Sequence, residues 1–383
     1  MVTRSDECLG EIGPFEVDVP WWAEVAPVVS VLERELGVPV TVLRLLSVEG
    51  SDGARDGHVT YHVEASARPS RPLRAAVFRD PPEPLRLPWA TREGITGLLD
   101  WAAGFVTLTG RAVQHKSWNL AALFRLPTAA GPVWLKATPP FAADEATAIA
   151  TIAAVDPTLV PEVLAAAPGR LLLADIPGED LWQASDAQVT STVSRWVAAQ
   201  AALATGPAGN PDFSSAGLRD GRPSLLAARI EGLLVRLAPE LPAETTARAR
   251  ALNARWAALS ACGLPDTLVH GDFHPGNWRG TPGSPPRVID FADAYWGNPV
   301  QDGLRAIDYL PGERRDTATA AWVGAWREHA PGADPERALT LGEPLAHLAY
   351  AVRYQEFLDG IEPDERIYHD GDPAASIRHA LAC

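Results

Sequence analysis

The chain has 383 residues, enough for roughly two or three packed modules. Hydrophobic residues make up 46% of it and charged residues 21%, a balance typical of a folded globular protein and not of a disordered chain. Asp and Glu number 48 against 33 Lys and Arg, and the formal net charge is −15. This charge argues against a nucleic-acid partner, because binding nucleic acid needs a basic face.

The three cysteines are too scattered to form a disulfide framework or a CxxC metal pair; they are Cys8, Cys262 and Cys383. The first 20 residues carry acidic groups and no apolar core of the kind that a signal peptide needs. No apolar run reaches the ~18 residues of a membrane span. We therefore expect a protein of the reducing cytoplasm, with no membrane partner.

Residues 1–80 predict a small helix-plus-sheet module. A helix is expected at 20–36, where apolar residues recur at helical spacing between an initial proline and a terminal glycine. Strands are expected at 40–48 and 58–65, and a third at 73–78. The module contains no recognisable chemical motif, and the sequence does not disclose its role.

A proline-rich linker at 80–88 ends this module, and we take 91–175 as the second one. Thr91 is placed to cap a helix. Three antiparallel strands are expected to follow, and then a helix and a short strand, at 112–114, 120–126, 132–138, 144–154 and 171–174.

Residues 176–383 predict a largely helical module. Its expected helices are 186–204, 224–238, 243–261, 315–329 and 335–358. A β-rich block followed by a helix-rich block is typical of an α+β protein with two lobes.

The most informative stretch is LVHGDFHPGNW, residues 268–278. Its polar residues His270, Asp272, His274 and Asn277 follow an apolar pair, and Asp290 ends a second apolar run further along the chain. Two carboxylates and a carboxamide in a short strand-loop-strand form an oxygen-ligand set suited to Mg²⁺.

The segments HGDFHPGN and IDFADAYWGNPVQD, between His270 and Asp302, resemble the motifs of the aminoglycoside phosphotransferase and choline kinase-like family. The resemblance implies a bilobal protein-kinase-like fold, with a small β-rich N-lobe and a larger helical C-lobe. It implies that Asp272 is the catalytic carboxylate, which orients the acceptor hydroxyl. It also implies that Asn277 and Asp290 hold Mg²⁺ against the phosphates of a co-substrate, ATP or GTP.

The same resemblance implies a nucleotide site upstream. Lys136, on the third strand of the N-lobe, would grip the phosphates and pair with Glu145 on the following helix. Leu173 and Asp175 would lie in the hinge whose backbone meets the nucleobase. No glycine-rich loop precedes Lys136, so Ser117 in QHKSWN is the expected phosphate contact.

The acceptor is expected to be a small molecule, because Gly271 stands where protein kinases carry Arg and no A-P-E segment follows. Candidate substrate contacts are Asp293, Trp296, Tyr354 and Glu356. The stretch 355–373 holds seven acidic residues, and an acidic lip of this kind would select an amine-bearing substrate.

Structural interpretations stand beside these roles. The two histidines fit loop-shaping hydrogen bonds, the lysine fits a strand position from which its charged end reaches solvent, and the aromatic residues fit a core. The acidic stretch fits a solvated face. Asp302 fits the first turn of a helix that begins near Asn298-Pro299, where negative charge is favourable.

These observations predict a phosphotransferase that moves the γ-phosphoryl group of a nucleoside triphosphate to a hydroxyl. The acceptor would be an antibiotic of aminoglycoside or nucleoside type, a sugar or an amino alcohol, and the protein would be a monomer or homodimer. Two alternatives remain open. One is a hydrolase with Zn²⁺ or Mn²⁺ on His270, Asp272, His274 and Asp290. The other is a nucleotide-binding pseudokinase that acts as an interaction module.

Overall fold

The computed structural model describes residues 1–5, 7–51, 53–205, 217–281 and 283–383. The chain divides into two compact units. Unit 1 comprises Met1–Phe141, Leu164–Asp175 and Phe357–Asp370, and unit 2 comprises Ala142–Val163, Ile176–Glu356 and Gly371–Cys383. The N-terminal module and the β-rich lobe, which the sequence separated at a linker, are both in unit 1.

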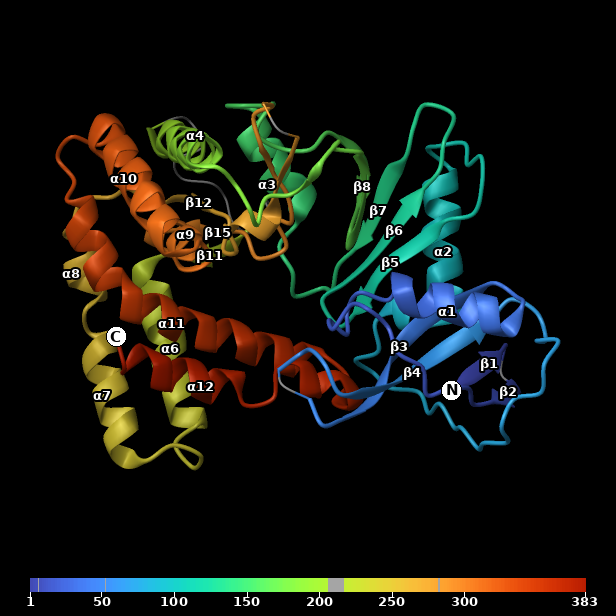
Figure 1. Cartoon of the computed structure of the whole chain (residues 1–383). Coiled ribbons are helices and arrows are strands. Elements are labelled where there is room, and N and C mark those ends of the chain that lie inside the picture. Colours follow the sequence, from blue (N-terminus) through green and yellow to red (C-terminus); the bar gives the residue numbers. More distant parts are fainter. Residues whose placement is uncertain (6, 52, 206–216, 282) are drawn as a thin grey trace. The chain divides into compact units, whose positions relative to one another are not determined.

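Two sheets and the helices packed on them form unit 1 (Figure 1). The first sheet has the order β2-β1-β4-β3, and the second has the order β5-β6-β7-β9-β8. The strands are β1 (Val2–Arg4), β2 (Glu7–Gly10), β3 (Val40–Glu49), β4 (His58–Ala65), β5 (Val113–Trp118), β6 (Ala121–Leu126), β7 (Val133–Ala137), β8 (Val163–Ala167) and β9 (Arg170–Ala174). The helices are α1 (Ala26–Leu36), η1 (Pro88–Ala90), α2 (Arg92–Ala103) and η3 (Pro363–Tyr368).

The first sheet differs from the sequence prediction in two of its strands. The strand expected at 73–78 is wrong, because this segment makes only an isolated bridge between Arg74 and Glu11, and Val77 is 90% exposed. Instead β1 and β2 complete the sheet, and β1 runs parallel to β4. Strands of three or four residues are too short for a recognisable alternation.

The N-terminal module has a core cluster of its own around α1, and it also contributes to a second core that it shares with the second sheet. Leu43 of β3 is buried in the same cluster as Trp89 and Leu135. The amide of Gln114 on β5 donates to the carbonyl of Val42 at 2.7 Å and accepts from its N–H at 2.9 Å, as a neighbouring strand would. The first 65 residues are therefore packed against the second sheet within unit 1.

Helix α2 follows the sequence pattern closely. The Thr91 side chain accepts a hydrogen bond from the Gly94 N–H at 3.1 Å, which confirms the predicted cap. Its apolar stripe, with Ile95 and Leu98, is buried in the shared core.

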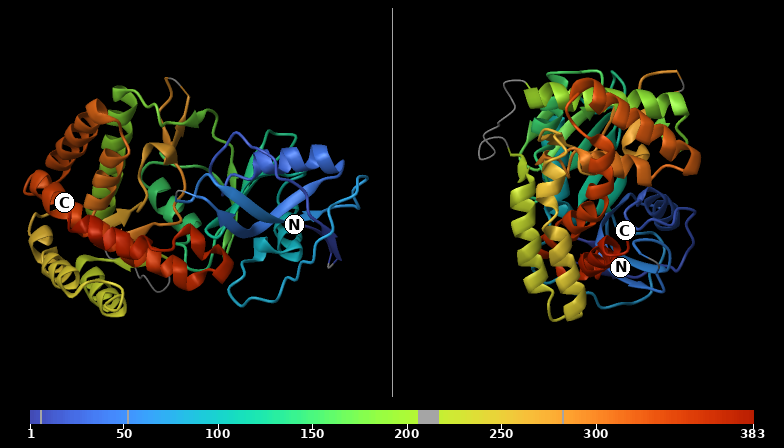
Figure 2. Two further views of the ribbon diagram at one scale, coloured as in Figure 1. Left: turned by 60° about the horizontal axis from the view of Figure 1, so that its bottom comes forward. Right: turned by 90° about the vertical axis from the view of Figure 1, so that its left-hand side faces the viewer.

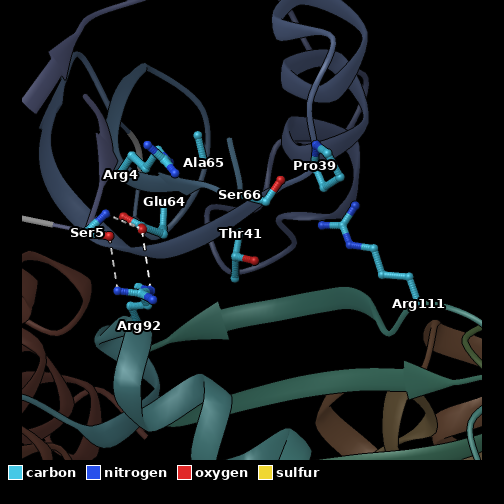
Figure 3. A pocket seen from close by; sticks show the side chains of 9 residues that line it. All are labelled: Arg4, Ser5, Pro39, Thr41, Glu64, Ala65, Ser66, Arg92 and Arg111. Atoms are coloured by element: carbon cyan, nitrogen blue, oxygen red, sulfur yellow. Dashed lines mark hydrogen bonds and ion pairs between the residues drawn. The ribbon is translucent and has the colours of Figure 1, made fainter. Parts of the chain in front are cut away.

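Unit 1 has a cavity of about 250 Å³ beside the start of α2. Figure 3 shows the side chains that line it. Two of its three basic side chains have partners. Arg92 donates to Ser5 at 3.2 Å and lies 3.8 Å from Glu64, while Arg111 bonds the Val40 carbonyl at 2.7 Å. These arginines join the N-terminal module to the second sheet.

Unit 2 is mainly helical, with two three-stranded sheets. Helices α4 and α10 pack side by side (Figures 1 and 2). The helices are α3 (Glu145–Ala153), α4 (Asp186–Thr205), α6 (Pro223–Arg236), α7 (Ala243–Asn253), α8 (Trp256–Ser260), η2 (Pro275–Asn277), α9 (Val300–Asp308), α10 (Gly312–His329), α11 (Pro335–Gly360) and α12 (Asp372–Ala380). The strands are β10 (Glu179–Asp180), β11 (Arg219–Gly221), β12 (Thr267–Val269), β13 (Trp278–Gly280), β14 (Arg287–Val288) and β15 (Tyr295–Gly297).

The sheets of unit 2 have the orders β10-β13-β14 and β11-β15-β12. Strand β12 is fully buried and leads into the polar loop at His270. The single helix predicted at 243–261 is two helices, α7 and α8, and α12 was not predicted. Helix α9 begins where the sequence predicted a helix start, next to Asn298-Pro299. Among the described residues, none of the helices combines the length and apolar composition that crossing a bilayer requires.

Candidate active site

The polar loop that follows β12 begins with a glycine that no other residue could replace without strain. Gly271 has φ +84°, and a Cβ at this position would lie 2.5 Å from the carbonyl oxygen of Asp293. The backbone therefore turns sharply at Gly271, between His270 and Asp272. This turn delivers the Asp272 side chain to the end of the strand.

Asp302, in the first turn of α9, holds this loop in place. Its buried carboxylate accepts hydrogen bonds from the backbone N–H groups of His270 and Gly271 at 2.9 and 3.0 Å. It also accepts from the indole of Trp196 at 2.8 Å and the amide of Gln200 at 3.0 Å. Burial raises the pKa of Asp302, and the four donors act in the opposite direction by stabilising its ionised form. The helix-start interpretation gave the correct position but missed this role.

His270 has both ring nitrogens in hydrogen bonds. Its Nδ1 accepts from the Asp272 N–H at 3.2 Å, and its Nε2 donates to the Ile289 carbonyl at 2.9 Å. The ring is buried, and this pattern belongs to the neutral form. The loop-shaping interpretation therefore fits His270, and a metal-ligand role does not. Within the described residues, no group of three or more His, Cys, Asp and Glu side chains could hold a metal.

Asp272 lies at the centre of the loop, and its side chain is 27% exposed. Its Oδ1 accepts from Nε of Arg305 at 2.7 Å, and Nη2 of the same guanidinium lies 2.7 Å away as an ion pair. Its Oδ2 accepts from Nε2 of His274 at 3.2 Å and from the amide of Asn277 at 3.0 Å. Burial alone would raise the pKa of Asp272, but Arg305 and His274 together hold it well below its usual range.

Asn277 and Asp290 belong to the same hairpin. Trp278 pairs with Val288 across β13 and β14, and the Ile289 N–H donates to the Asn277 carbonyl at 2.9 Å. The residue after Ile289 is Asp290, so its backbone lies next to Asn277 at the open end of the hairpin. Asp290 also has φ +66°, a left-handed conformation that is unusual for a residue with a side chain.

The donor set of this hairpin fits Mg²⁺. The Asn277 amide nitrogen is committed to Asp272, which leaves its oxygen as the coordinating atom. One amide oxygen and one carboxylate are the small complement of protein ligands that Mg²⁺ uses when phosphates and waters supply the others. Asn277 and Asp290 are thus the residues that would hold the metal.

Glu145 and Lys136 belong to different units, and the ion pair between them stays a prediction. The Glu145 carboxylate is buried at the start of α3 and accepts a hydrogen bond from the Phe291 N–H at 2.9 Å. It therefore contacts the backbone next to Asp290. Lys136 is buried on β7, where it pairs with Leu123 and Leu171 of the neighbouring strands.

The other residues expected at the nucleotide site lie in unit 1. Ser117 is 2% exposed, and its hydroxyl donates to the Leu43 carbonyl at 3.4 Å. This contact engages the Ser117 hydroxyl with the backbone, and its contact with a phosphate stays a prediction. The Asp175 carboxylate accepts from the indole of Trp134 at 2.6 Å, and Leu173 pairs with Trp134 in the ladder between β7 and β9.

Two of the expected substrate residues form ion pairs. The Asp293 carboxylate accepts from Arg353 at 2.7 Å, and the Glu356 carboxylate accepts from Arg353 and Arg219 at 3.0 and 3.1 Å. Trp296 is 2% exposed within β15, which makes it a core residue and closes it to a ligand. An acidic site for an amine would need carboxylates that are not already balanced by arginines.

The acidic stretch at 355–373 is divided between the two units. Tyr354, just before it, is largely buried, and this burial raises its pKa to about 12. Glu362 and Glu365 are buried in unit 1, where Arg44 lies 3.6 Å from Glu362. Neither the acidic lip nor the solvated face describes these two residues.

Sequence reasoning missed Arg305, although it follows Asp302 by one helical turn in α9. Its guanidinium lies 4.3 Å from the ring centroid of Tyr309 and 5.1 Å from that of Tyr350. The spacing places Asp302 and Arg305 on neighbouring turns of one helix face. That spacing was the available signal, because the sequence already predicted a helix that begins near Asn298-Pro299.

Residues 111–341 match the model of the phosphotransferase enzyme family, which is more than half of the chain. A search among curated proteins gave no significant match.

Solved structures share the fold at low sequence identity. A choline/ethanolamine kinase family protein from Mesorhizobium loti is 19% identical, with a TM-score of 0.51 over 74% of this chain and 98% of that one. A macrolide 2'-phosphotransferase type I is 15% identical, with a TM-score of 0.52 over 74% and 97%. An ADP-bound aminoglycoside phosphotransferase, APH(2'')-Ib, is 14% identical, with a TM-score of 0.50 over 74% and 97%.

The fold is therefore the protein-kinase-like one, with a β-rich N-terminal part and a helical C-terminal part. The chain belongs to the phosphotransferase enzyme family, whose members include the aminoglycoside phosphotransferases and choline kinases, and it is a phosphotransferase that acts on hydroxyl groups. The family match begins at residue 111 and leaves the N-terminal module outside it.

Proposed function

We propose that this enzyme transfers the γ-phosphoryl group of ATP or GTP, with Mg²⁺, to a hydroxyl of a small molecule. The acceptor would be an antibiotic of aminoglycoside or nucleoside type, or a sugar. One observation carries the proposal: Asp272 and Asn277 are hydrogen-bonded at 3.0 Å, on the hairpin that also presents Asp290.

Asp272 would act mainly by orientation. In the transfer, the bond between the γ-phosphorus and its bridging oxygen breaks, and a bond to the acceptor oxygen forms. The acceptor proton passes to the Asp272 carboxylate and then to solvent. A carboxylate whose pKa is depressed is a weak base, and this suits a loose transition state in which the proton leaves late. Arg305 and His274 would keep this carboxylate ionised and fixed in direction.

The metal and nucleotide contacts follow from the remaining residues. Mg²⁺, when bound by Asn277 and Asp290, would neutralise charge on the phosphates. Lys136 would contact the phosphates, and Glu145 would orient Lys136 while it holds the backbone at Phe291. The nucleobase would meet the backbone near Leu173 and Asp175. The ADP in the related aminoglycoside phosphotransferase supports a nucleotide as co-substrate.

A panel of hydroxylated antibiotics, nucleosides, sugars and amino alcohols tests the proposal. Each compound is incubated with the full chain, Mg²⁺ and ATP or GTP, and mass spectrometry is used to look for an added phosphate. We expect a Mg²⁺-dependent phosphorylated product. Nucleotide binding with no transfer to any compound would instead favour the pseudokinase alternative.

A further inference from the structure

An exposed aromatic cluster lies beside Asp272 in unit 2. Trp182 is 46% exposed and Tyr309 is 41% exposed, which is unusual for large aromatic side chains. The His274 ring stacks against both of them, with centroids 5.1 Å from Trp182 and 4.7 Å from Tyr309. Because His274 also donates to the Asp272 carboxylate, the cluster adjoins the proposed reaction centre.

The fold fixes this cluster to the polar loop. The Leu181 N–H donates to the carbonyls of Pro275 and Trp278 at 3.0 and 2.9 Å, so the segment before Trp182 lies directly on the loop. A Cβ on Gly276 would lie 2.2 Å from the Trp182 ring, and only glycine admits this close packing. Trp182 is therefore held against the loop although nearly half of it remains open to solvent.

The charges next to the cluster do not favour a cationic acceptor. The Arg305 guanidinium lies over the Tyr309 ring at 4.3 Å and already provides the cation–π contact there. Asp293 and Glu356, the carboxylates that the sequence offered as substrate contacts, are bound by Arg353 and Arg219. A cationic ligand bound at this surface would be repelled by the Arg305 guanidinium.

We propose that Trp182, His274 and Tyr309 form the acceptor subsite, and that it binds a neutral or anionic hydroxyl compound with a flat ring. This inference rests on the proposed function and narrows it. A nucleoside-type or glycosylated aromatic acceptor fits the surface, because its ring can stack on Trp182 or Tyr309 while a hydroxyl reaches Asp272. A polycationic aminoglycoside does not fit it.

The test measures binding and transfer separately on the full chain with Mg²⁺. Isothermal titration with Mg²⁺-ADP present compares three probes: uridine, which is neutral, its 6-carboxylate, which is anionic, and kanamycin, which is a polycation. The same probes are then incubated with ATP or GTP and examined by mass spectrometry. We expect a ring probe to bind at least tenfold more tightly than kanamycin, and Trp182→Ala to weaken that binding at least tenfold.

Two variants serve as controls. Trp21→Ala removes a tryptophan of similar exposure, 48%, from the N-terminal module, and its affinity for the ring probe should stay within twofold of the wild type. Asp308→Asn removes the exposed acid next to Tyr309 in the chain, and ring-probe binding should again change less than twofold. Thermal melting of each variant checks that it is folded.

The outcomes distinguish the subsite from the proposed function. Three results would overturn the subsite. Kanamycin could bind most tightly, none of the probes could bind, or folded Trp182→Ala could bind the ring probe as tightly as the wild type does. Transfer to kanamycin alone would do the same and would leave the proposed function standing. Binding of a ring probe that depends on Trp182, without transfer to any hydroxyl, would support the subsite and count against the proposed function.

Discussion

Replacing Arg305 by Gln should change the pH dependence of the reaction. In the wild type, two guanidinium nitrogens lie 2.7 Å from Oδ1 of Asp272, and the two side chains are only 19% and 27% exposed. A neighbouring opposite charge of this kind lowers a carboxyl pKa by roughly 1–3 units. Without Arg305, burial is the main remaining influence on the pKa of Asp272, and burial raises it.

The sign of the effect follows from this shift. Because its pKa is depressed, Asp272 stays ionised even at pH ~4, the ordinary pKa of an aspartate. The kcat/KM of the wild type should therefore not fall above pH ~5 through protonation of Asp272. In Arg305→Gln the pKa of Asp272 should return to about 4 or rise above it. The kcat/KM of the variant should then fall as the pH is lowered from ~6 to ~4. At pH 7 the variant should lose about 1–3 kcal/mol of stability, because the ionised carboxylate loses its partner.

The assay is kcat/KM between pH 4.5 and 9, plotted as the ratio of variant to wild type. This ratio removes the titration of the nucleotide and the acceptor, which both enzymes share. Arg305→Lys keeps the charge but not the planar fork, so it should give an intermediate curve. A ratio that stays constant over the whole range would show that Arg305 does not control the ionisation of Asp272.

Three further predictions concern the metal site, the loop and the interior of unit 1. Asp290→Ala should weaken Mg²⁺-dependent nucleotide binding at least tenfold by calorimetry, and wild-type affinity would remove this residue from the metal site. Asp302→Asn should cost about 2–4 kcal/mol of stability in denaturant unfolding, because an amide cannot accept from four N–H donors, and an unchanged unfolding midpoint would contradict that role. Burial raises the pKa of Glu365 to about 8, so this group contributes stability below pH ~4.5 that is lost as the pH rises through about 8. Glu365→Gln should therefore raise the melting temperature at pH 8.5 more than at pH 5, and an equal effect at both pH values would be inconsistent with a buried titrating carboxyl.

Local patterns in the sequence predicted much of the fold. The alternation of 58–65 became β4 with the same ends, and the Thr91 cap opened α2 as expected. The failures come from segments whose signals are short or non-local. Strands β1 and β2 have three and four residues and are stabilised by pairing with each other and with β4, which lies some 60 residues away.

The polar loop at His270 was predictable because its signals are also local. Asp272, Asn277 and Asp290 lie within a hairpin and the loop before it, so their proximity follows from local sequence. Residues that act across the fold were harder to find. Arg305 reaches Asp272 only because α9 packs against the loop, and the aromatic cluster needs Trp182 from a segment almost 90 residues before Asp272.

The charge pattern near the C-terminus was the least informative feature. The stretch 355–373 has seven acidic residues among nineteen, which suggested an exposed segment. Glu362 and Glu365 of this stretch are nevertheless buried. Arg44, the ion-pair partner of Glu362, and Leu45, whose N–H donates to Glu365, lie more than 300 residues earlier in the chain. A run of like charges does not reveal cations that tertiary folding brings to it.

The central claim is that Asp272 carries out phosphoryl transfer at the centre formed with Asn277 and Asp290. Its most direct test is the transfer of labelled γ-phosphate by the wild type and by Asp272→Asn, measured with the nucleotide affinity of both proteins. The variant should transfer about 10²–10⁴-fold more slowly and bind Mg²⁺-nucleotide with an affinity within threefold of the wild type. Transfer by the folded variant at the wild-type rate would contradict the claim.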